Sequence, residues 1–107
     1  MIAVTTDTVP GRDTAAALGI VRGSTVRAKH IGGDIVAGLR NLVGGEVHEY
    51  ARLLADARDL ALERMLADAA RLQADAVVAV RFQTSTIQQG ASEVMCYGTA
   101  VRLSPAA

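Results

Sequence analysis

Aromatic residues, cysteine and proline are all scarce in this chain of 107 residues. It has no tryptophan, two prolines, one phenylalanine (Phe82) and one cysteine (Cys96). Much of the apolar content is alanine, which removes little surface from water at about 25 cal/mol per Å² of buried apolar area. We therefore expect one domain, spanning residues 1–107, that gains further burial by packing against partner subunits.

A net charge is also absent, because eleven basic and eleven acidic residues cancel. Without a positive field, neither nucleic acid nor an anionic membrane is expected as a primary partner. A single cysteine cannot form an intrachain disulfide, which is typical of a reducing compartment. No apolar run approaches the roughly 20 residues of a membrane-spanning helix, and no leader pattern opens the chain. The sequence predicts a soluble, cytoplasmic protein.

Hydrophobic periodicity predicts an α+β fold with the element order β-β-α-α-β-β. A short helix is expected to begin at Asp34, its N-cap, and to end before Gly44-Gly45. A long helix is expected over residues 47–72. The expected strands are residues 2–6, 15–26, 76–87 and 93–103, of which the last two form an antiparallel hairpin. The predicted architecture has two layers, an antiparallel sheet packed by a short and a long helix.

Three of these strands carry further local signals. Gly19 and Gly23 inside the second strand predict a bulge, or a place where another backbone comes close. Alternation in the next strand places Val78, Val80 and Phe82 on one face. In the last strand, one face is expected to be buried and holds Val94, Cys96, Gly98 and Ala100. A small buried thiol usually serves packing, so Cys96 is expected to be inert.

The apolar face of the long helix changes direction halfway along. At about 100° per residue, the charged stripe of the first half is Arg52, Asp56, Asp59 and Glu63, and that of the second half is Arg64, Asp68 and Arg71. One straight helix cannot easily lay two apolar faces on one small sheet, so a neighbouring subunit is expected to cover the second. A twisted sheet or the short helix is the alternative cover. The candidate interface residues are Arg58, Leu62 and Leu66.

Several strings run in order over nearly the whole chain: Thr5-Thr6, Gly19-Ile-Val-Arg-Gly23, Ala37-Gly-Leu-Arg-Asn-Leu-Val-Gly-Gly45, Tyr50, Ala57-Arg58, Ala74-Asp-Ala-Val-Val78 and Gly98-Thr-Ala-Val101. Together they resemble the YbjQ-like family of small bacterial proteins, also called "putative heavy-metal-binding proteins". The resemblance implies helices packed on an antiparallel sheet, broadly as in a dodecin subunit. It also implies a ring-shaped homo-oligomer, a pentamer.

Two positions depart from the family pattern. Gln73 stands where the family usually has glycine, and in a left-handed helix cap glutamine costs up to about 1 kcal/mol. Ala51 follows Tyr50, at a position where the family commonly has an acidic residue. Any role that the acidic residue has in the family is therefore in doubt for this chain.

The best local group of metal-binding side chains is Glu46, His48 and Glu49. One chain lacks the ligand spacing of a structural zinc site, but a ring would repeat these residues around its axis. They would then be candidate ligands for a divalent metal between subunits. Acids are also expected at a helix N-terminus, so a solvated helix start with a surface histidine is the preferred interpretation.

A non-enzymatic ring-forming binding or scaffold protein, whose partner is itself, is the preferred function. It would hold a divalent metal or a small ligand between subunits. The competing class is an enzyme with an active site assembled between subunits from His30, Asp34, His48 or Cys96. A dodecin-like carrier of a flat cofactor is a third alternative, and the scarcity of aromatic residues argues against it.

Overall fold

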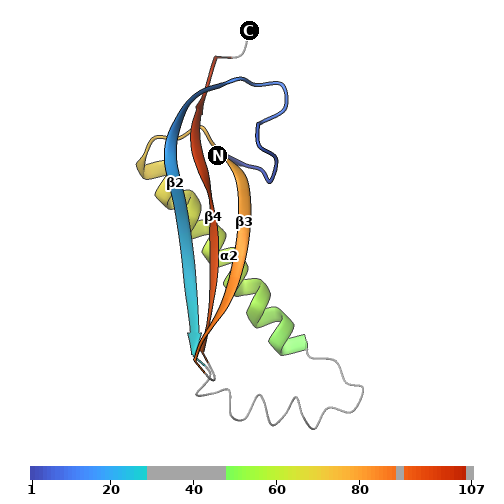
Figure 1. Cartoon of the computed structure of the whole chain (residues 1–107). Helices are drawn as coiled ribbons and strands as arrows, with labels where there is room; N and C mark the ends of the chain where they lie inside the picture. Colours follow the sequence, from blue (N-terminus) through green and yellow to red (C-terminus); the bar gives the residue numbers. More distant parts are fainter. Residues whose placement is uncertain (29–47, 89–90, 106–107) are drawn as a thin grey trace.

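The computed structural model describes residues 1–28, 48–88 and 91–105, and its elements are shown in Figure 1. They are strands β1 (Ile2–Ala3) and β2 (Thr14–Ala28), helix α2 (His48–Arg71), and strands β3 (Ala76–Gln88) and β4 (Ala91–Leu103). The long helix and the four strands confirm the α+β expectation. The short helix expected from Asp34 lies outside the described residues.

The four strands form one sheet in the order β1-β3-β4-β2. β4 pairs antiparallel with both β2 and β3, which confirms the predicted hairpin. β1 pairs parallel with β3, with Ile2 opposite Ala76, so the sheet is mixed and the expectation of a purely antiparallel sheet is wrong. β2 and β3 occupy the two sides of β4, so the remaining place for β1 is the outer edge of β3. There β1 runs parallel to β3. Strand periodicity alone does not show this placement.

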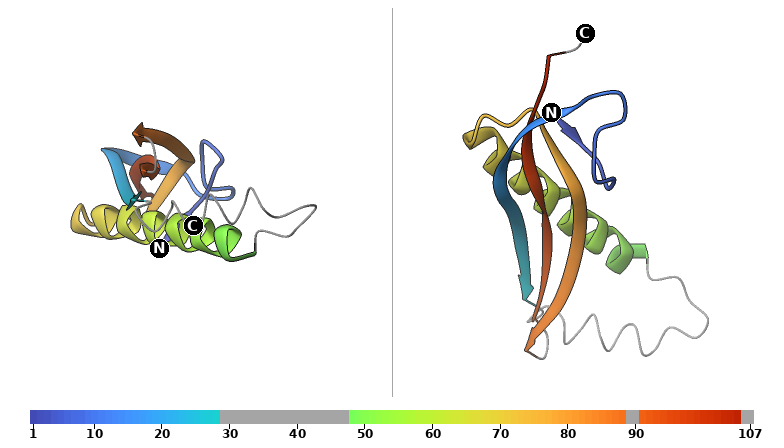
Figure 2. Two further views of the ribbon diagram at one scale, coloured as in Figure 1. Left: turned by 90° about the horizontal axis from the view of Figure 1, so that it is seen from below. Right: turned by 45° about the horizontal axis from the view of Figure 1, so that its top comes forward.

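Helix α2 covers one face of the sheet and runs obliquely across it, as Figures 1 and 2 show. We call this the inner face, and the opposite one the outer face. The helix packs mainly against β2 and β4 and touches β3 little. Phe82 of β3 is consequently 45% exposed, although it lies opposite the buried Cys96.

Every fourth residue of α2 forms its contact with the sheet, and all four are fully buried: Ala57, Ala61, Met65 and Ala69. Small side chains in this row let the helix backbone approach β2 closely. At the point of approach, a Cβ on Gly23 would collide with the backbone of α2. Nearby, the buried hydroxyl of Thr25 donates to the carbonyl oxygen of Ala57 at 3.2 Å.

A bulge or a close backbone approach was predicted at the two glycines of β2, and the structure has one of each. The register of β2 against β4 shifts between Ala17 and Gly19, where Gly19 has a φ of 126°, a conformation that favours glycine. Gly23 is the position of close backbone approach. The predicted buried face of β4 is also confirmed, because its four residues are all buried.

A bulge in β3 overturns the prediction that Val78 and Val80 share a face. Val78 pairs with Thr99 and Arg81 with Tyr97, so two residues of β3 oppose Gly98 alone. Ala79, inside the bulge, has a φ of 54°. The extra residue reverses the alternation, and Val80 joins the inner core while Val78 packs on the outer face.

The outer face therefore has a small core of its own at one end of the sheet. Its buried residues are Val9, Ala76, Val78, Val101 and Leu103. The N-terminal segment covers them, held by hydrogen bonds from the Val4 N–H to Val77 and from the Ala79 and Val80 N–H groups to Thr6 and Val4. In the described parts of the chain, no helix is both long and apolar enough to cross a membrane.

Candidate functional site

The residues proposed as metal ligands cannot be located as a group. Glu46 lies outside the described residues, and so do His30 and Asp34. His48 and Glu49 begin α2, but their side chains are not described. Within the described ranges, no three histidine, cysteine or acidic side chains come together as a metal site would require. The Glu46, His48 and Glu49 cluster thus stays a prediction.

Cys96 lies on the inner face beneath α2 and is fully buried. Its Sγ is 3.5 Å from the Sδ of Met65. Burial raises the pKa of the Cys96 thiol, because the thiolate would lose its hydration. A neutral thiol against a thioether is a packing contact, which agrees with the expectation from the sequence.

The predicted interface residues occupy different environments. Arg58 is exposed, whereas Leu62 and Leu66 are half-buried and pack against the edge of the inner core. The sheet therefore covers part of the second apolar face of α2. The remaining exposed part of the two leucines lies toward the side of α2 that faces away from the sheet.

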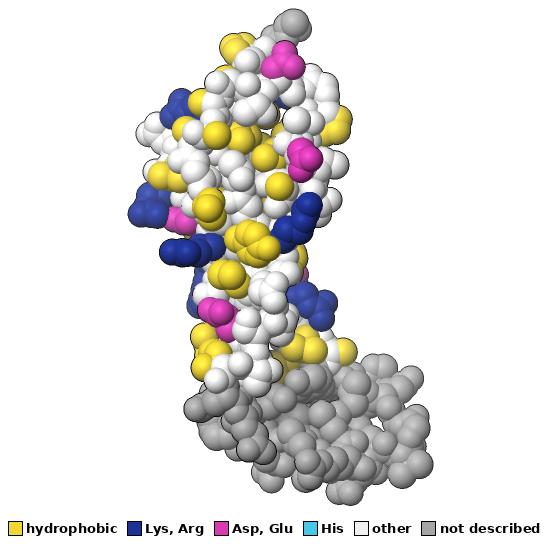
Figure 3. Space-filling model, viewed as in Figure 1, with side chains coloured by type: hydrophobic (Ala, Val, Ile, Leu, Met, Phe, Trp, Pro, Cys, Tyr) yellow, Lys and Arg dark blue, Asp and Glu magenta, His cyan; other side chains and the backbone are white. Residues whose placement is uncertain are grey.

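Among the described residues, no helix lies over the central part of the outer face of the sheet, and apolar side chains are exposed there. Ile20 and Val26 of β2 are 77% and 57% exposed there. Met95 and Tyr97 of β4, on the same face, are half-buried. Figure 3 shows apolar side chains running down this face, with basic and acidic side chains on both sides of them.

A row of three side chains crosses the middle of the outer face. Tyr97 of β4 pairs with Arg22 of β2 on one side and with Arg81 of β3 on the other. Arg81 is held in place, because its Nη1 donates to the carbonyl oxygens of Thr5 and Val80, both at 2.9 Å. Two exposed guanidinium groups thus flank one phenol. This arrangement suits an acidic partner surface.

The free edge of β2 is protected by side chains of α2. The N–H of Arg22 donates to Asp68 Oδ2 at 3.2 Å, and Arg64 Nη1 donates to the carbonyl oxygen of Ser24 at 2.6 Å. Asp68 also accepts a hydrogen bond from Arg71. The Arg71 bond first, and the Arg22 bond second, lower the pKa of Asp68.

Within the described parts of the chain, the free edge of β3 is protected at one end, where the N–H of Val80 donates to Val4. Strand groups alternate in direction, so Phe82, Thr84 and Thr86 also turn their N–H and C=O groups away from β4. Their side chains are exposed, and no described residue bonds these backbone groups. As far as residues 1–28, 48–88 and 91–105 show, this stretch is an open strand edge.

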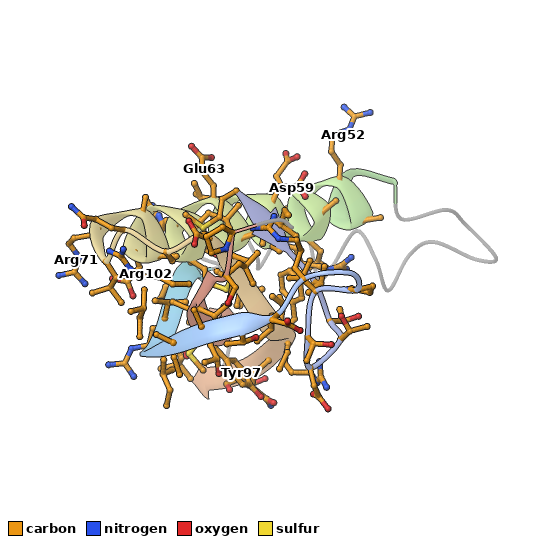
Figure 4. The ribbon with its side chains drawn as sticks, turned by 90° about the horizontal axis from the view of Figure 1, so that it is seen from above. Arg52, Asp59, Glu63, Arg71, Tyr97 and Arg102 are labelled. Atoms are coloured by element: carbon orange, nitrogen blue, oxygen red, sulfur yellow. The ribbon has the colours of Figure 1, made fainter. Side chains whose placement is uncertain are left out.

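The side of α2 that points away from the sheet carries mostly acidic charge. Figure 4 shows Arg52, Asp59 and Glu63 projecting from this side, while Tyr97 projects from the opposite side of the molecule. Asp56 belongs to the same helical stripe by its spacing. All four are exposed.

The architecture defines a class of protein: a small α+β domain with one described helix on a four-strand mixed sheet. The chain belongs to the YbjQ family, because the family model described as "Putative heavy-metal-binding" matches residues 1–104. A crystal structure of a protein of unknown function from Pediococcus pentosaceus has the same fold, with a TM-score of 0.69, 16% sequence identity, and coverage of 97% of this chain and 98% of that one.

Relatives called UPF0145 proteins match over almost their full length. The protein from Archaeoglobus fulgidus is 59% identical, covering 96% of this chain and 95% of its own. The protein from Shewanella frigidimarina is 53% identical, covering 98% of each chain. Because archaeal species are among these relatives, the family is not confined to bacteria.

Proposed function

We propose that this protein is a non-enzymatic, ring-forming homo-oligomer, a pentamer in the cytoplasm, that acts as a binding or scaffold protein. The observation that carries the proposal is the outer face of the sheet, over whose centre no described helix lies. Ile20 and Val26 are more than half exposed there, beside the half-buried Met95 and Tyr97. Exposed apolar patches of this kind mark interaction surfaces.

The shape of the subunit points the same way. Strands of 13 to 15 residues are long, since about 5 to 6 is usual. A thin, elongated subunit of this kind gains most by burying its flat faces against neighbours.

A divalent heavy metal bound between subunits is the proposed ligand. The imidazole of His48 and the carboxylates of Glu46 and Glu49 are donors that suit zinc, nickel or copper. Cys96 would not join them, because its Sγ is buried beneath α2. The description of the family as heavy-metal-binding supports this part of the proposal.

Native mass spectrometry of untagged protein, purified without a chelator, tests the assembly. We expect one species at five times the chain mass of 11.1 kDa. A folded single chain at micromolar concentration would refute the proposal.

Calorimetric titration with zinc, nickel and copper tests the metal site. The wild type is expected to bind at least one of these ions, and His48→Ala to bind it at least tenfold more weakly. Identical isotherms for the two proteins would remove this site. Cys96→Ala is the matched control and should bind like the wild type.

A further inference from the structure

The two broad surfaces of the subunit lie on opposite sides of the molecule (Figure 4). The middle of the outer sheet face presents Arg22 and Arg81 around Tyr97, and the half-buried Glu93 lies farther along β4 on the same face. The outward side of α2 presents Asp56, Asp59 and Glu63, with Arg52 nearer its N-terminus. A surface on one side that complements the surface on the other allows identical copies to stack in one direction.

The acidic stripe of α2 has spacings that repel within its own helix. Asp56 and Asp59 are three residues apart, and Asp59 and Glu63 are four apart, so like charges are neighbours on the helix surface. Among the described residues, the ion pair within α2 joins Arg71 to Asp68, and none reaches the three acids of the stripe. A basic surface from outside the subunit would relieve this repulsion.

Apolar contact is available on both surfaces. Leu66 lies only about 20° around the helix axis from Asp59, and it is half-buried rather than fully covered. On the sheet, Ile20 is 77% exposed beside the row formed by Arg22 and Tyr97. Each surface therefore combines an apolar part with exposed charges, which are basic in the row of Arg22 and Arg81 and mostly acidic along α2, as a specific interface requires.

Symmetric pairing of like faces is disfavoured. Two outer sheet faces in contact would bring the arginines of one copy toward those of the other. Two helix faces in contact would oppose the acids in the same way. Like charges brought together in this manner suppress an interface. The charge pattern thus selects contact between unlike faces.

We infer that copies of this chain associate head to tail, with the outer sheet face of one subunit packed on the outward side of α2 of the next. Arg22 and Arg81 then lie toward Asp59 and Glu63 of the neighbour, and Leu66 meets the apolar part of the sheet face. This inference rests on the proposed self-assembly and specifies its contact. A heterologous contact of this type closes into a ring when the rotation between copies permits it.

Charge reversal tests the contact, with the subunit number and dissociation constant measured by analytical ultracentrifugation. Arg22→Glu and Glu63→Arg should each weaken association at least tenfold, and more so at low salt. The double variant carries both changes, so each interface again joins opposite charges. The increase in the logarithm of its dissociation constant should therefore be at most half of the increase seen in the single variants. Circular dichroism checks that every variant is folded.

Arg102→Glu is the matched control. It makes the same charge change on β4, where the exposed Arg102 bonds only Gln73 Oε1 at 3.1 Å among the described residues. We expect it to associate like the wild type. Equal weakening by Arg102→Glu would overturn the inference, because net charge rather than the two faces would then govern association.

Thr84→Pro tests whether copies associate through the open edge of β3 rather than through the two faces. The N–H of Thr84 points away from β4, so proline there removes an edge donor and leaves the ladder to β4 in place. Assembly that survives Thr84→Pro and fails in the reversal variants supports the inference. Assembly that fails in Thr84→Pro and survives both reversals would overturn it.

The outcomes also separate this inference from the proposed function. A monomeric wild type would end both. A wild-type oligomer whose mass and dissociation constant are unchanged in both reversal variants would end the head-to-tail contact alone. If Arg22→Glu is unfolded, Arg22→Gln and Glu63→Gln replace the reversals, and each should weaken association and flatten its salt dependence.

Discussion

The backbone of Gly23 in β2 lies directly against the backbone of Met65 in α2. A Cβ atom on Gly23 would overlap the Met65 amide nitrogen, the Ala61 carbonyl oxygen and the Cβ of Arg64. Two of these three atoms belong to backbone, which cannot move aside as a flexible side chain can. Glycine at this position therefore sets the distance between the helix and the sheet.

Gly23→Ala is expected to lower the free energy of unfolding by about 1–3 kcal/mol, the usual cost of overpacking a filled core. Chemical denaturation monitored by circular dichroism measures it. Ser24→Ala, at the next residue of β2, is the control and should cost less than about 1 kcal/mol. Equal effects of the two changes would show that α2 does not lie as close to β2 as described.

The C-terminus of α2 offers a stabilising substitution. Gln73 has a φ of 60°, and the N–H groups of Gln73 and Ala74 donate to the carbonyls of Ala70 and Ala69 at 2.9 and 3.2 Å. This is a Schellman cap with glutamine in the position that favours glycine. Gln73→Gly should raise the free energy of unfolding by up to about 1 kcal/mol.

Gln73→Ala is the control for the cap, since it also removes the hydrogen bond from Arg102 but keeps a Cβ in the left-handed conformation. It should be no more stable than the wild type. If alanine stabilises as much as glycine, the backbone conformation of Gln73 is not the cause.

The Cys96 thiol should resist modification while the protein is folded. Its Sγ is buried against Met65, and burial raises its pKa. Iodoacetamide at pH 8 is expected to label it at least a hundredfold more slowly in native protein than in urea. Rapid labelling of native protein would contradict the buried position.

Cys96 also predicts a loss of stability at alkaline pH. The pKa of the thiol is higher in the folded protein than in the unfolded chain. Its contribution to the free energy of unfolding is therefore complete below the usual pKa of about 8.5, and it is lost as the pH rises through the pKa of the folded state. The stability of Cys96→Ala should therefore fall less between pH 8 and pH 10 than that of the wild type. Parallel pH profiles would contradict the prediction.

Asp68 predicts the opposite dependence at acidic pH. Hydrogen bonds from Arg71 and from the Arg22 N–H lower its pKa, so its contribution is present above the usual value of about 3.9 and is lost as the pH falls through the lower folded value. Asp68→Asn should be less stable than the wild type at pH 7, and this difference should shrink toward pH 2. A stability difference between Asp68→Asn and the wild type that stays constant from pH 7 to pH 2 would contradict the prediction.

The sequence predicted the elements well because each one carries a local signal. Helix α2 was expected over residues 47–72 and spans His48–Arg71. The glycines of β2 and the family position of Gln73 also pointed correctly to special backbone geometry. These features depend on neighbours in the chain, which a sequence displays directly.

The bulge at Ala79 and the parallel pairing of β1 were missed because both depend on distant residues. Nothing in the sequence around Ala79 interrupts the alternation of Val78 and Val80, and the extra residue is apparent only opposite Gly98. The row of Arg22, Tyr97 and Arg81 was missed for the same reason, since it requires the register of three strands.

The bulge in β3 divides the hydrophobic interior between two faces of one sheet. The smaller part depends on a few side chains and on the N-terminal segment that hydrogen-bonds to Val77, Ala79 and Val80. It can therefore open by itself while α2 stays on the sheet, as local cooperative units do. Amide protons of Val4, Ala79 and Val80 should then exchange with solvent deuterium well before those between β2 and β4, so that the two ends of one strand report separate opening events.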